Sequence, residues 1–243
     1  MKPSAWYSAA ILLAICSGCR HQSASSAQPH STATGSAIVE SSGGKQLGSP
    51  GATLAQPLVV QVNDKQGNGV TGALVTFSGV DGAAFDPAQA LTDSSGQAST
   101  QVTLGGIAGR YEVTASSLDA SGKPFVLTIV ELAAGYEQRL GFELDQKYCA
   151  RCHDSESSAL RVSNYDNLAV KPHPFAEGDT LNRLSDADLT AIIGHGGPSM
   201  NKSALMPPFG STLDKAETQA LISYIRLVSE PPYRLPGVVY ARQ

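Results

Sequence analysis

The chain has 243 residues, of which 42% are hydrophobic and 16% charged, and its formal net charge is −4. This length suffices for one or two domains with packed cores. The absence of a basic field argues against nucleic acid as a partner.

The four cysteines form two close pairs, Cys16 with Cys19 and Cys149 with Cys152. No cysteine lies in the long stretch between the pairs, which is not the pattern of a disulfide scaffold. The spacing indicates two separate, local uses of sulfur.

Residues 1–18 have the features of an export signal. Lys2 precedes an apolar or small-residue run that is too short to span a bilayer. The end of this run, Ile15-Cys16-Ser17-Gly18-Cys19, resembles the bacterial lipoprotein signal. The resemblance implies that Cys19 is lipidated, becomes the new N-terminus and anchors the protein to a membrane facing the periplasm or cell surface. An ordinary signal peptide cut nearby is the alternative.

Residues 19–50 are rich in Ser, Ala, Thr, Gln and Gly and lack hydrophobic periodicity. Such a composition cannot bury a core, so we expect a flexible tether here.

Residues 51–133 contain short β-prone runs separated by Gly, Asn and Asp turns, with no helical period. This spacing predicts an antiparallel sandwich. The expected strands cover 58–62, 73–77, 99–104, 111–115 and 125–130.

The stretches 57–77 and 92–116 resemble the bacterial Ig-like repeats of the invasin and intimin type. The resemblance implies a rigid spacer or presentation module. The more specific alternative is that this domain docks to a redox partner or a surface polymer. The sequence does not indicate which residues would form such a docking surface.

The run Cys149-Ala150-Arg151-Cys152-His153 is the C-x-x-C-H sequence of covalent haem attachment. Two thiols spaced three apart on one helical turn can each add to a haem vinyl group, and the adjacent imidazole can then ligate the iron. A zinc site needs two further ligands, a thioredoxin-like dithiol needs a βαβ setting, and a structural disulfide leaves His153 unexplained. The sequence therefore predicts one covalent haem c.

Residues 134–229 resemble a small class I cytochrome c, which predicts an all-α domain after the all-β one. The resemblance implies that Met206, in Leu205-Met206-Pro207-Pro208-Phe209-Gly210, is the distal iron ligand on a proline-stiffened loop. Met200, His195 and His173 are the alternatives. A Met/His pair raises the haem potential relative to bis-His ligation.

Helices are expected over 136–148, from Ser185 to Gly194, and after a capping box formed by Asp214 and Glu217. The resemblance makes Gly141 a close-contact glycine. It also makes Asp145 a departure from the usual aromatic, for which Phe142 or Tyr148 could compensate.

In the cytochromes that this region resembles, a proline carbonyl often accepts the Nδ1–H of the proximal His. The resemblance makes Pro172 and Pro174 the candidates here, with neither assigned. Residues 230–243 form a Pro-rich tail that is expected to wrap over the domain or a partner.

A haem with two protein ligands has no open position, which favours electron transfer between redox partner proteins over catalysis. Two alternatives remain open. One is a haem-based sensor or peroxide enzyme with a labile Met206. The other is an adhesin-like binding module with an accessory cytochrome domain.

Overall fold

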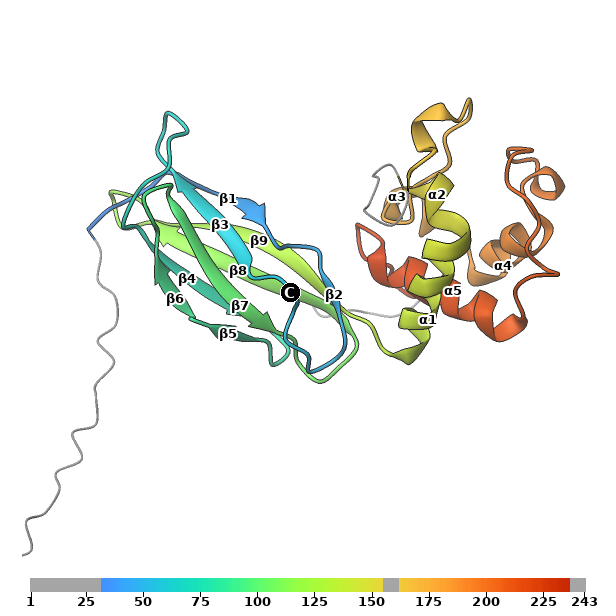
Figure 1. Ribbon diagram of the computed structural model, residues 1–243, viewed down its shortest axis with the longest axis horizontal. Helices are drawn as coiled ribbons and strands as arrows, with labels where there is room; N and C mark the ends of the chain where they lie inside the picture. The colour runs from blue at the N-terminus through green and yellow to red at the C-terminus, as the bar shows by residue number, and fades with distance from the viewer. Residues whose placement is uncertain (1–31, 155–161, 237–243) are drawn as a thin grey trace, which may run out of the picture.

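The computed structural model describes residues 32–154 and 162–236, and these residues form a β-sandwich followed by a helical domain (Figure 1). The two domains follow each other directly along the chain. Two residues separate the end of strand β9 (Pro124–Ala133) from the start of helix α1 (Tyr136–Leu144).

The sandwich consists of two sheets, and the hydrogen-bonded order in the first is β1-β3-β7-β5 and in the second β2-β9-β8-β4-β6. Within the sheets every pairing is antiparallel except that of β2 with β9. The strands other than β9 are β1 (Ala37–Ser42), β2 (Leu47–Gly48), β3 (Leu58–Asn63), β4 (Leu74–Gly79), β5 (Ala84–Asp86), β6 (Gln89–Leu91), β7 (Gln97–Thr103) and β8 (Gly109–Leu118).

The core of the sandwich follows from the alternation along its central strands. In β3 the side chains of Leu58, Val60 and Val62 are buried, whereas the residues between them are partly exposed. This period of two places every second side chain between the sheets. The inward side chains of β4, β7, β8 and β9 complete one continuous apolar cluster.

Three strand connections share one turn chemistry. In each, an Asp side chain accepts backbone N–H bonds from the residues two and four positions later, and a glycine three positions later has positive φ. The pairs are Asp64 with Gly67, Asp93 with Gly96, and Asp119 with Gly122. These turns account for the β-run spacing seen in the sequence.

The tether predicted over 19–50 is wrong for its second part, because β1 and β2 belong to the sandwich. Strand β1 lies at a sheet edge and buries only Ile38, so its residues carry almost no hydrophobic pattern. Its place is set by backbone pairing with β3. The first part of the predicted tether, residues 19–31, lies outside the described residues.

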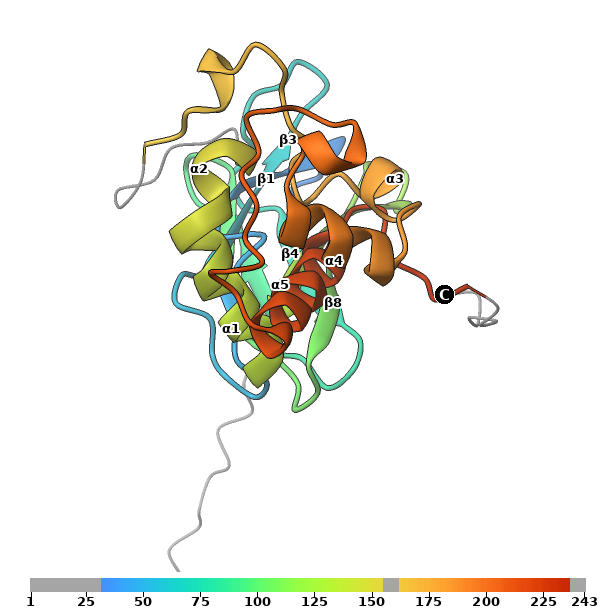
Figure 2. The same cartoon turned by 90° about the vertical axis from the view of Figure 1, so that its right-hand side faces the viewer.

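The helical domain contains two crossing helices, α1 and α5 (Lys215–Val228), and a third, α4 (Asp186–His195), packed on α5 (Figure 2). Shorter elements are η1 (Asp145–Cys149), α2 (Ala150–His153), η2 (Tyr165–Asn167), α3 (Gly178–Leu181) and η3 (Pro198–Met200). Leu144, Ile193, Leu221, Ile222 and Ile225 lie in its separate apolar core. None of the described helices is long and apolar enough to cross a membrane.

The expected helix starts agree with the structure, whereas the first helical segment continues to His153 instead of ending at 148. Both predicted N-caps carry reciprocal capping boxes, Ser185 with Asp188 and Asp214 with Glu217. At the α1–α5 crossing, a Cβ on Gly141 would lie 2.1 Å from the carbonyl oxygen of Ala220, so only glycine permits this approach. Phe142 meets Tyr224 edge-on at 5.6 Å between ring centroids, and thus supplies the aromatic contact that Asp145 cannot.

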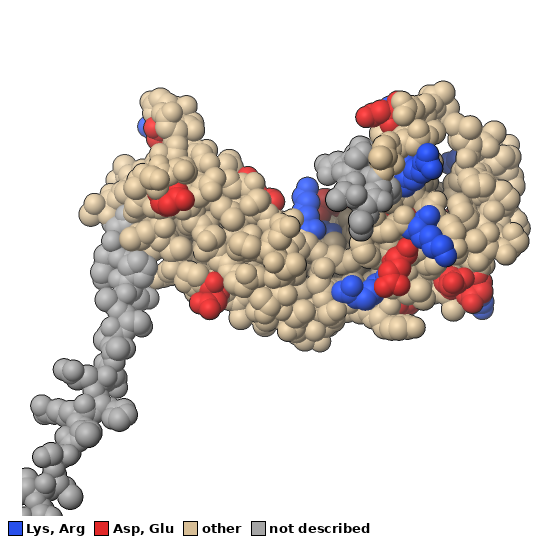
Figure 3. Space-filling model, viewed as in Figure 1, with Lys and Arg blue, Asp and Glu red and all other residues tan. Residues whose placement is uncertain are grey.

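Charged side chains are unevenly distributed over the visible face of the molecule. Acidic and basic groups lie close together over the helical domain, whereas the sandwich shows only scattered ones (Figure 3). This face therefore presents no large field of a single sign.

Candidate cofactor site

The helix that carries the C-x-x-C-H run is continuous from Tyr136 to His153 but changes its winding immediately before the first cysteine. Residues Asp145–Cys149 form a π-helical turn, in which the N–H of Ala150 donates to the carbonyl of Asp145. A π-turn inserts one extra residue and re-aims the side chains after it, which is why such turns occur at functional sites. Cys149, Cys152 and His153 all line the same pocket.

Neither Cys149 nor Cys152 forms a disulfide within the described part of the chain. Cys149 is buried, and its burial, together with the negative charge of Asp145, raises the pKa of its thiol to about 12. Before any covalent attachment this sulfur is therefore a neutral thiol at physiological pH.

The imidazole of His153 is held from two sides. Its Nδ1 lies 2.9 Å from the carbonyl oxygen of His173, and the ring of Phe175 packs against it at 4.7 Å between centroids. A carbonyl can only accept, so Nδ1 carries the proton and Nε2 keeps a free lone pair. Burial lowers the pKa of His153 despite the opposing effect of this hydrogen bond, which favours the neutral, ligating form.

The acceptor of this bond corrects a sequence-based expectation. Pro172 and Pro174 were the candidates, but the bond goes to the carbonyl of His173, which lies between them. The side chain of His173 also pairs with the Glu177 carboxylate, with Nδ1 and Oε2 separated by 3.0 Å. A backbone acceptor has no residue-type signature, although the His-x-x-x-Glu spacing of 173 and 177 hints at a fixed loop.

Met206 lies on a loop that is hydrogen-bonded to the end of α4. The N–H of Gly197 donates to the carbonyl of Met206 at 3.0 Å, and the N–H of Phe209 donates to that of Ile193 at 2.9 Å. Gly196 has a φ of +77°, and a Cβ there would lie 2.9 Å from the Met206 carbonyl oxygen. The two glycines therefore let the loop pack closely, which explains the His195-Gly196-Gly197 run.

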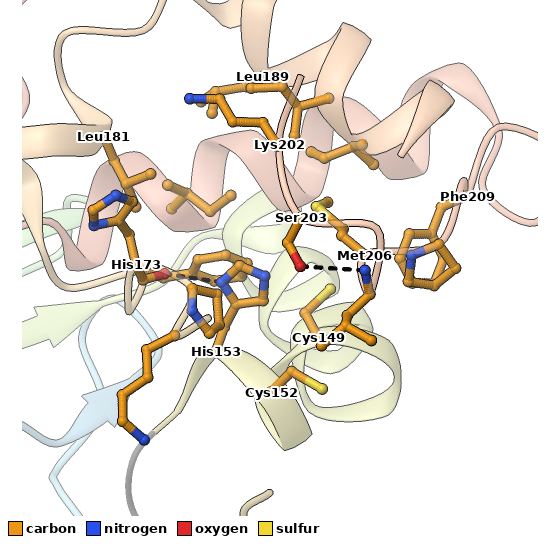
Figure 4. Close-up of a pocket in the computed structure, with 18 of the residues that line it drawn as sticks. Cys149, Cys152, His153, His173, Leu181, Leu189, Lys202, Ser203, Met206 and Phe209 are labelled. Carbon is orange, nitrogen blue, oxygen red and sulfur yellow. Dashed lines mark hydrogen bonds between the residues drawn. The ribbon is translucent and has the colours of Figure 1, made fainter. Parts of the chain in front are cut away.

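A pocket of about 520 Å³ lies between these elements, with the cysteines, His153 and Met206 in its walls (Figure 4). Its volume is in the range of cofactor sites. Most of the remaining lining is apolar: Leu168, Val170, Phe175, Leu181, Leu184, Leu189, Ile192, Ile193, Leu205, Pro207, Phe209, Leu221 and Ile225.

The donor set and the pocket together fit a haem. Two thiols, an imidazole with a free Nε2 and a thioether meet one apolar space that could hold a flat macrocycle. The chemistry of each donor suits haem c, since thiols form the covalent links and imidazole and thioether are its usual axial ligands.

The alternative ligands occupy other positions. His195 lies at the end of α4 and lines a different pocket with Asp214 and Lys215. Met200 belongs to η3 and is absent from the pocket lining. His173 does line the pocket, but its ring is paired with Glu177. The predicted lipid-bearing residue, Cys19, lies outside the described residues.

In comparison with known proteins, a different family model matches each of the two domains. Residues 53–130 match the family model of the bacterial Ig-like domain, group 1. Residues 137–225 match the family model of cytochrome c oxidase, cbb3-type, subunit III. We found no match among curated protein sequences.

Solved structures with some similarity include bacterial adhesins. The D00-D0 domain of intimin is 15% identical with a TM-score of 0.31, and the match covers 44% of this chain and 51% of that one. Invasin, an integrin-binding protein, is 18% identical with a TM-score of 0.31, covering 43% and 21%. The Yersinia pseudotuberculosis adhesin InvE is 16% identical with a TM-score of 0.27, covering 39% and 31%. The chain thus spans about half of the intimin structure and less of the other two.

The two family matches agree with the two folded units. The sandwich contains the first matched range and the helical domain contains the second, with its C-x-x-C-H run at the end of the continuous helical segment from Tyr136 to His153. The chain is therefore multidomain, with an all-β Ig-like sandwich followed by a helical cytochrome c domain.

Proposed function

We propose that this protein is an exported, membrane-tethered electron carrier with one haem, bound covalently by Cys149 and Cys152 and ligated by His153 and Met206. The observation that carries the proposal is the single apolar pocket to which the C-x-x-C-H helix and the Met206 loop both contribute. A cytochrome c domain fits an electron carrier better than an enzyme, although it is also compatible with a subunit of a redox complex.

When bound, a haem supplies reversible one-electron chemistry. The residues of this chain would determine how that chemistry is used. His153 offers Nε2 because its Nδ1 proton is engaged by the His173 carbonyl. Met206 offers a thioether, which favours ferrous iron. If His153 and Met206 both held the iron, the protein would leave no coordination position for a substrate.

The pocket rim suits transient docking of redox partner proteins. Val170 and Leu205 both line the pocket and are 61% and 63% exposed. Lys171 and Lys202 lie beside this apolar rim. A small apolar contact edged by charge is suited to weak, fast encounters. We therefore propose this rim as the surface for electron entry and exit.

The N-terminal part of the proposal rests on sequence. A diacylated Cys19 followed by a polar segment would hold both domains near a membrane surface, in the periplasm or at the cell exterior. Ig-like and cytochrome c domains both suit an extracytoplasmic location, where disulfide and haem c chemistry take place.

The first test is the visible spectrum of the full chain matured in a host that exports proteins and attaches haem c. We expect a c-type spectrum that persists through denaturation, and a weak far-red band in the oxidised protein from iron–methionine charge transfer. The double variant Cys149→Ser/Cys152→Ser is the control and should lose haem on denaturation.

Two results would change the reading. Haem without the far-red band would mean that Met206 is not the distal ligand, and a sensor or small-ligand enzyme would be favoured. A chain that never acquires haem would contradict the proposal.

A further inference from the structure

The two domains are joined by an arginine that reaches from the sandwich to the end of the last helix. Arg110, on β8, donates from Nη1 to the carbonyls of Leu227 and Ser229, both at 3.1 Å, and its Nη2 forms an ion pair with the Glu230 carboxylate. The Arg110 side chain is 17% exposed and Ser229 is fully buried.

This contact places a positive charge at the C-terminal end of α5 in the cytochrome domain. The last carbonyls of α5 have no partners within the helix, and the helix dipole places partial negative charge at this end. The planar guanidinium can bind several acceptors at once, which a lysine ammonium cannot do with the same geometry. The Ig-like domain therefore caps the final helix of its neighbour.

The segment held by Arg110 in turn holds the loop before α3. The N–H of Glu230 donates to the carbonyl of Ala176 at 2.8 Å, and the N–H of Gly178 donates to the carbonyl of Glu230 at 2.9 Å. Asn182 adds a side-chain bond to the Pro231 carbonyl. A Cβ on Gly178 would lie 2.4 Å from that same carbonyl oxygen, so the two segments are in close contact.

The supported loop also carries the acceptor of the His153 proton. Its N-terminal part is fixed by the Glu177 N–H bond to the Pro174 carbonyl and by the Glu177–His173 side-chain pair. Bonding to His173 lowers the pKa of Glu177 and keeps its carboxylate charged. The His173 carbonyl then receives the Nδ1–H of His153.

We propose that Arg110 is a positioning residue for His153, acting through Glu230 and the 173–178 loop. The Ig-like domain is then more than a spacer, because it supports the hydrogen bond that orients the proximal imidazole. Partners that hold a ligand imidazole set its basicity as well as its orientation. The role of His153 as iron ligand rests on the proposed function, whereas the mechanical route from Arg110 to the loop does not.

The route is tested by amide hydrogen exchange, followed by mass spectrometry, on the full chain and its Arg110→Ala variant. We expect peptides covering 173–182 to exchange about tenfold faster in the variant, as local opening becomes easier. Arg139→Ala is the matched control, because Arg139 makes a second interdomain side-chain bond, from Nη2 to Ser49 Oγ at 3.1 Å. That bond does not involve Glu230. Its loss should therefore leave the hydrogen-exchange rate of the peptides covering 173–182 as it is in the wild type.

A second, milder variant distinguishes the loss of this contact from misfolding of Arg110→Ala. Glu230→Gln removes the ion pair with Arg110 but keeps the backbone bonds of residue 230, and it should accelerate the same peptides to a smaller extent. If the 173–182 peptides exchange at the wild-type rate in Arg110→Ala, or equally fast in Arg139→Ala, the proposal is overturned. Neither the expected nor the contradicting hydrogen-exchange result requires a bound haem.

The last link, to His153, is tested by the reduction potential of the haem-loaded protein. A weaker Nδ1–H bond makes the imidazole a poorer donor and favours ferrous iron, so the potential should move upward in Arg110→Ala and stay unchanged in Arg139→Ala. An unchanged potential in both variants would overturn the link to His153. Failure to bind haem would instead be a failure of the proposed function, visible already in the wild-type spectrum.

Discussion

Met206 is the residue whose role is most directly testable. Its loop is anchored to α4 by backbone bonds that do not involve its side chain, so Met206→Ala should keep the fold. Loss of the thioether should abolish the far-red band and lower the reduction potential by on the order of 0.1 V, within the ~0.8 V range that axial ligands control. Redox titration with spectral detection measures both.

Met200→Ala is the control for this prediction, because Met200 lies on η3 and is absent from the pocket lining. It should resemble the wild type in band and potential. If Met200→Ala removed the far-red band and Met206→Ala did not, the ligand assignment would be wrong.

Gly141 tests the packing that supports the C-x-x-C-H helix. In Gly141→Ala the new methyl group would lie 2.1 Å from the Ala220 carbonyl oxygen and 2.7 Å from Tyr224 Cβ, so α1 and α5 must move apart. We expect a loss of about 1–3 kcal/mol in the free energy of unfolding, typical of overpacking. Denaturant unfolding followed by the helical circular dichroism signal measures it.

A second glycine provides the contrast. Gly194 lies within α4, and a Cβ there meets no atom within 4 Å. Gly194→Ala should therefore stabilise the protein by up to about 1 kcal/mol through helix propensity alone. Equal destabilisation by both substitutions would contradict the steric argument.

At this scale the sequence is informative where residue type determines the chemistry. Cys149, Cys152, His153 and Met206 could be singled out because the proposed tasks, covalent attachment of haem and ligation of its iron, call for thiols, imidazole and thioether. The acceptor of the His153 proton was not predictable, since any residue supplies a carbonyl and the local backbone selects His173.

Among the elements, helix ends were predictable because their signals are local. Ser185 and Asp214 each form a capping box with a residue three positions later, and both boxes are in the structure. Strand β1 was missed because its pairing partners on β3 are distant in sequence, as Ala37 with Asn63 shows, and its only buried side chain is Ile38. A short edge strand is defined by backbone pairing, which leaves little trace in composition.

Strand β9 contains a buried carboxyl group that links the stability of the sandwich to pH. Glu131 is fully buried; its Oε2 accepts the Gln46 N–H at 2.7 Å, and its Oε1 has no partner among the described residues. Burial raises the pKa of Glu131 from 4.5 to about 7, with a further contribution from the negative charge of Glu40. The native state therefore retains this proton at a pH where the unfolded chain has lost it.

The sign of the pH effect follows from that difference. Between pH 4.5 and about 7 the unfolded state binds fewer protons, so stability falls as pH rises, and the loss is complete near pH 8. The shift corresponds to at most roughly 3 kcal/mol. Denaturant unfolding of the full chain at pH 5 and pH 8, followed by the β-sheet signal, should show this decrease. Glu131→Gln, which cannot ionise, should remove most of it, and an unchanged decrease would rule out Glu131 as its source.

For the whole molecule, the order of domains was predictable because each has its own pattern, alternation in the first and helical period in the second. Their mutual contact was not, since Arg110 and Ser229 are far apart in sequence and individually ordinary. Nothing in the sequence indicates which strand residue meets the end of α5. The contact arises only once β8 and α5 are both folded.

The proposed lipid anchor at Cys19 concerns the position of the whole molecule in the cell. If Cys19 is lipidated, its acyl chains hold both folded domains at a surface, since two chains anchor stably where one gives only marginal binding. Cys19→Ser should therefore move the protein from the membrane fraction to the soluble fraction, with haem still attached because Cys149 and Cys152 are intact.

Cys16→Ser is the matched control, as it removes the neighbouring thiol within the proposed signal and should leave the protein membrane-bound. Fractionation by centrifugation, with haem staining of both fractions and the mass of the N-terminal peptide, measures the outcome. Retention of Cys19→Ser in the membrane would mean that another segment holds the protein there, and release of Cys16→Ser alone would shift the anchor to that residue.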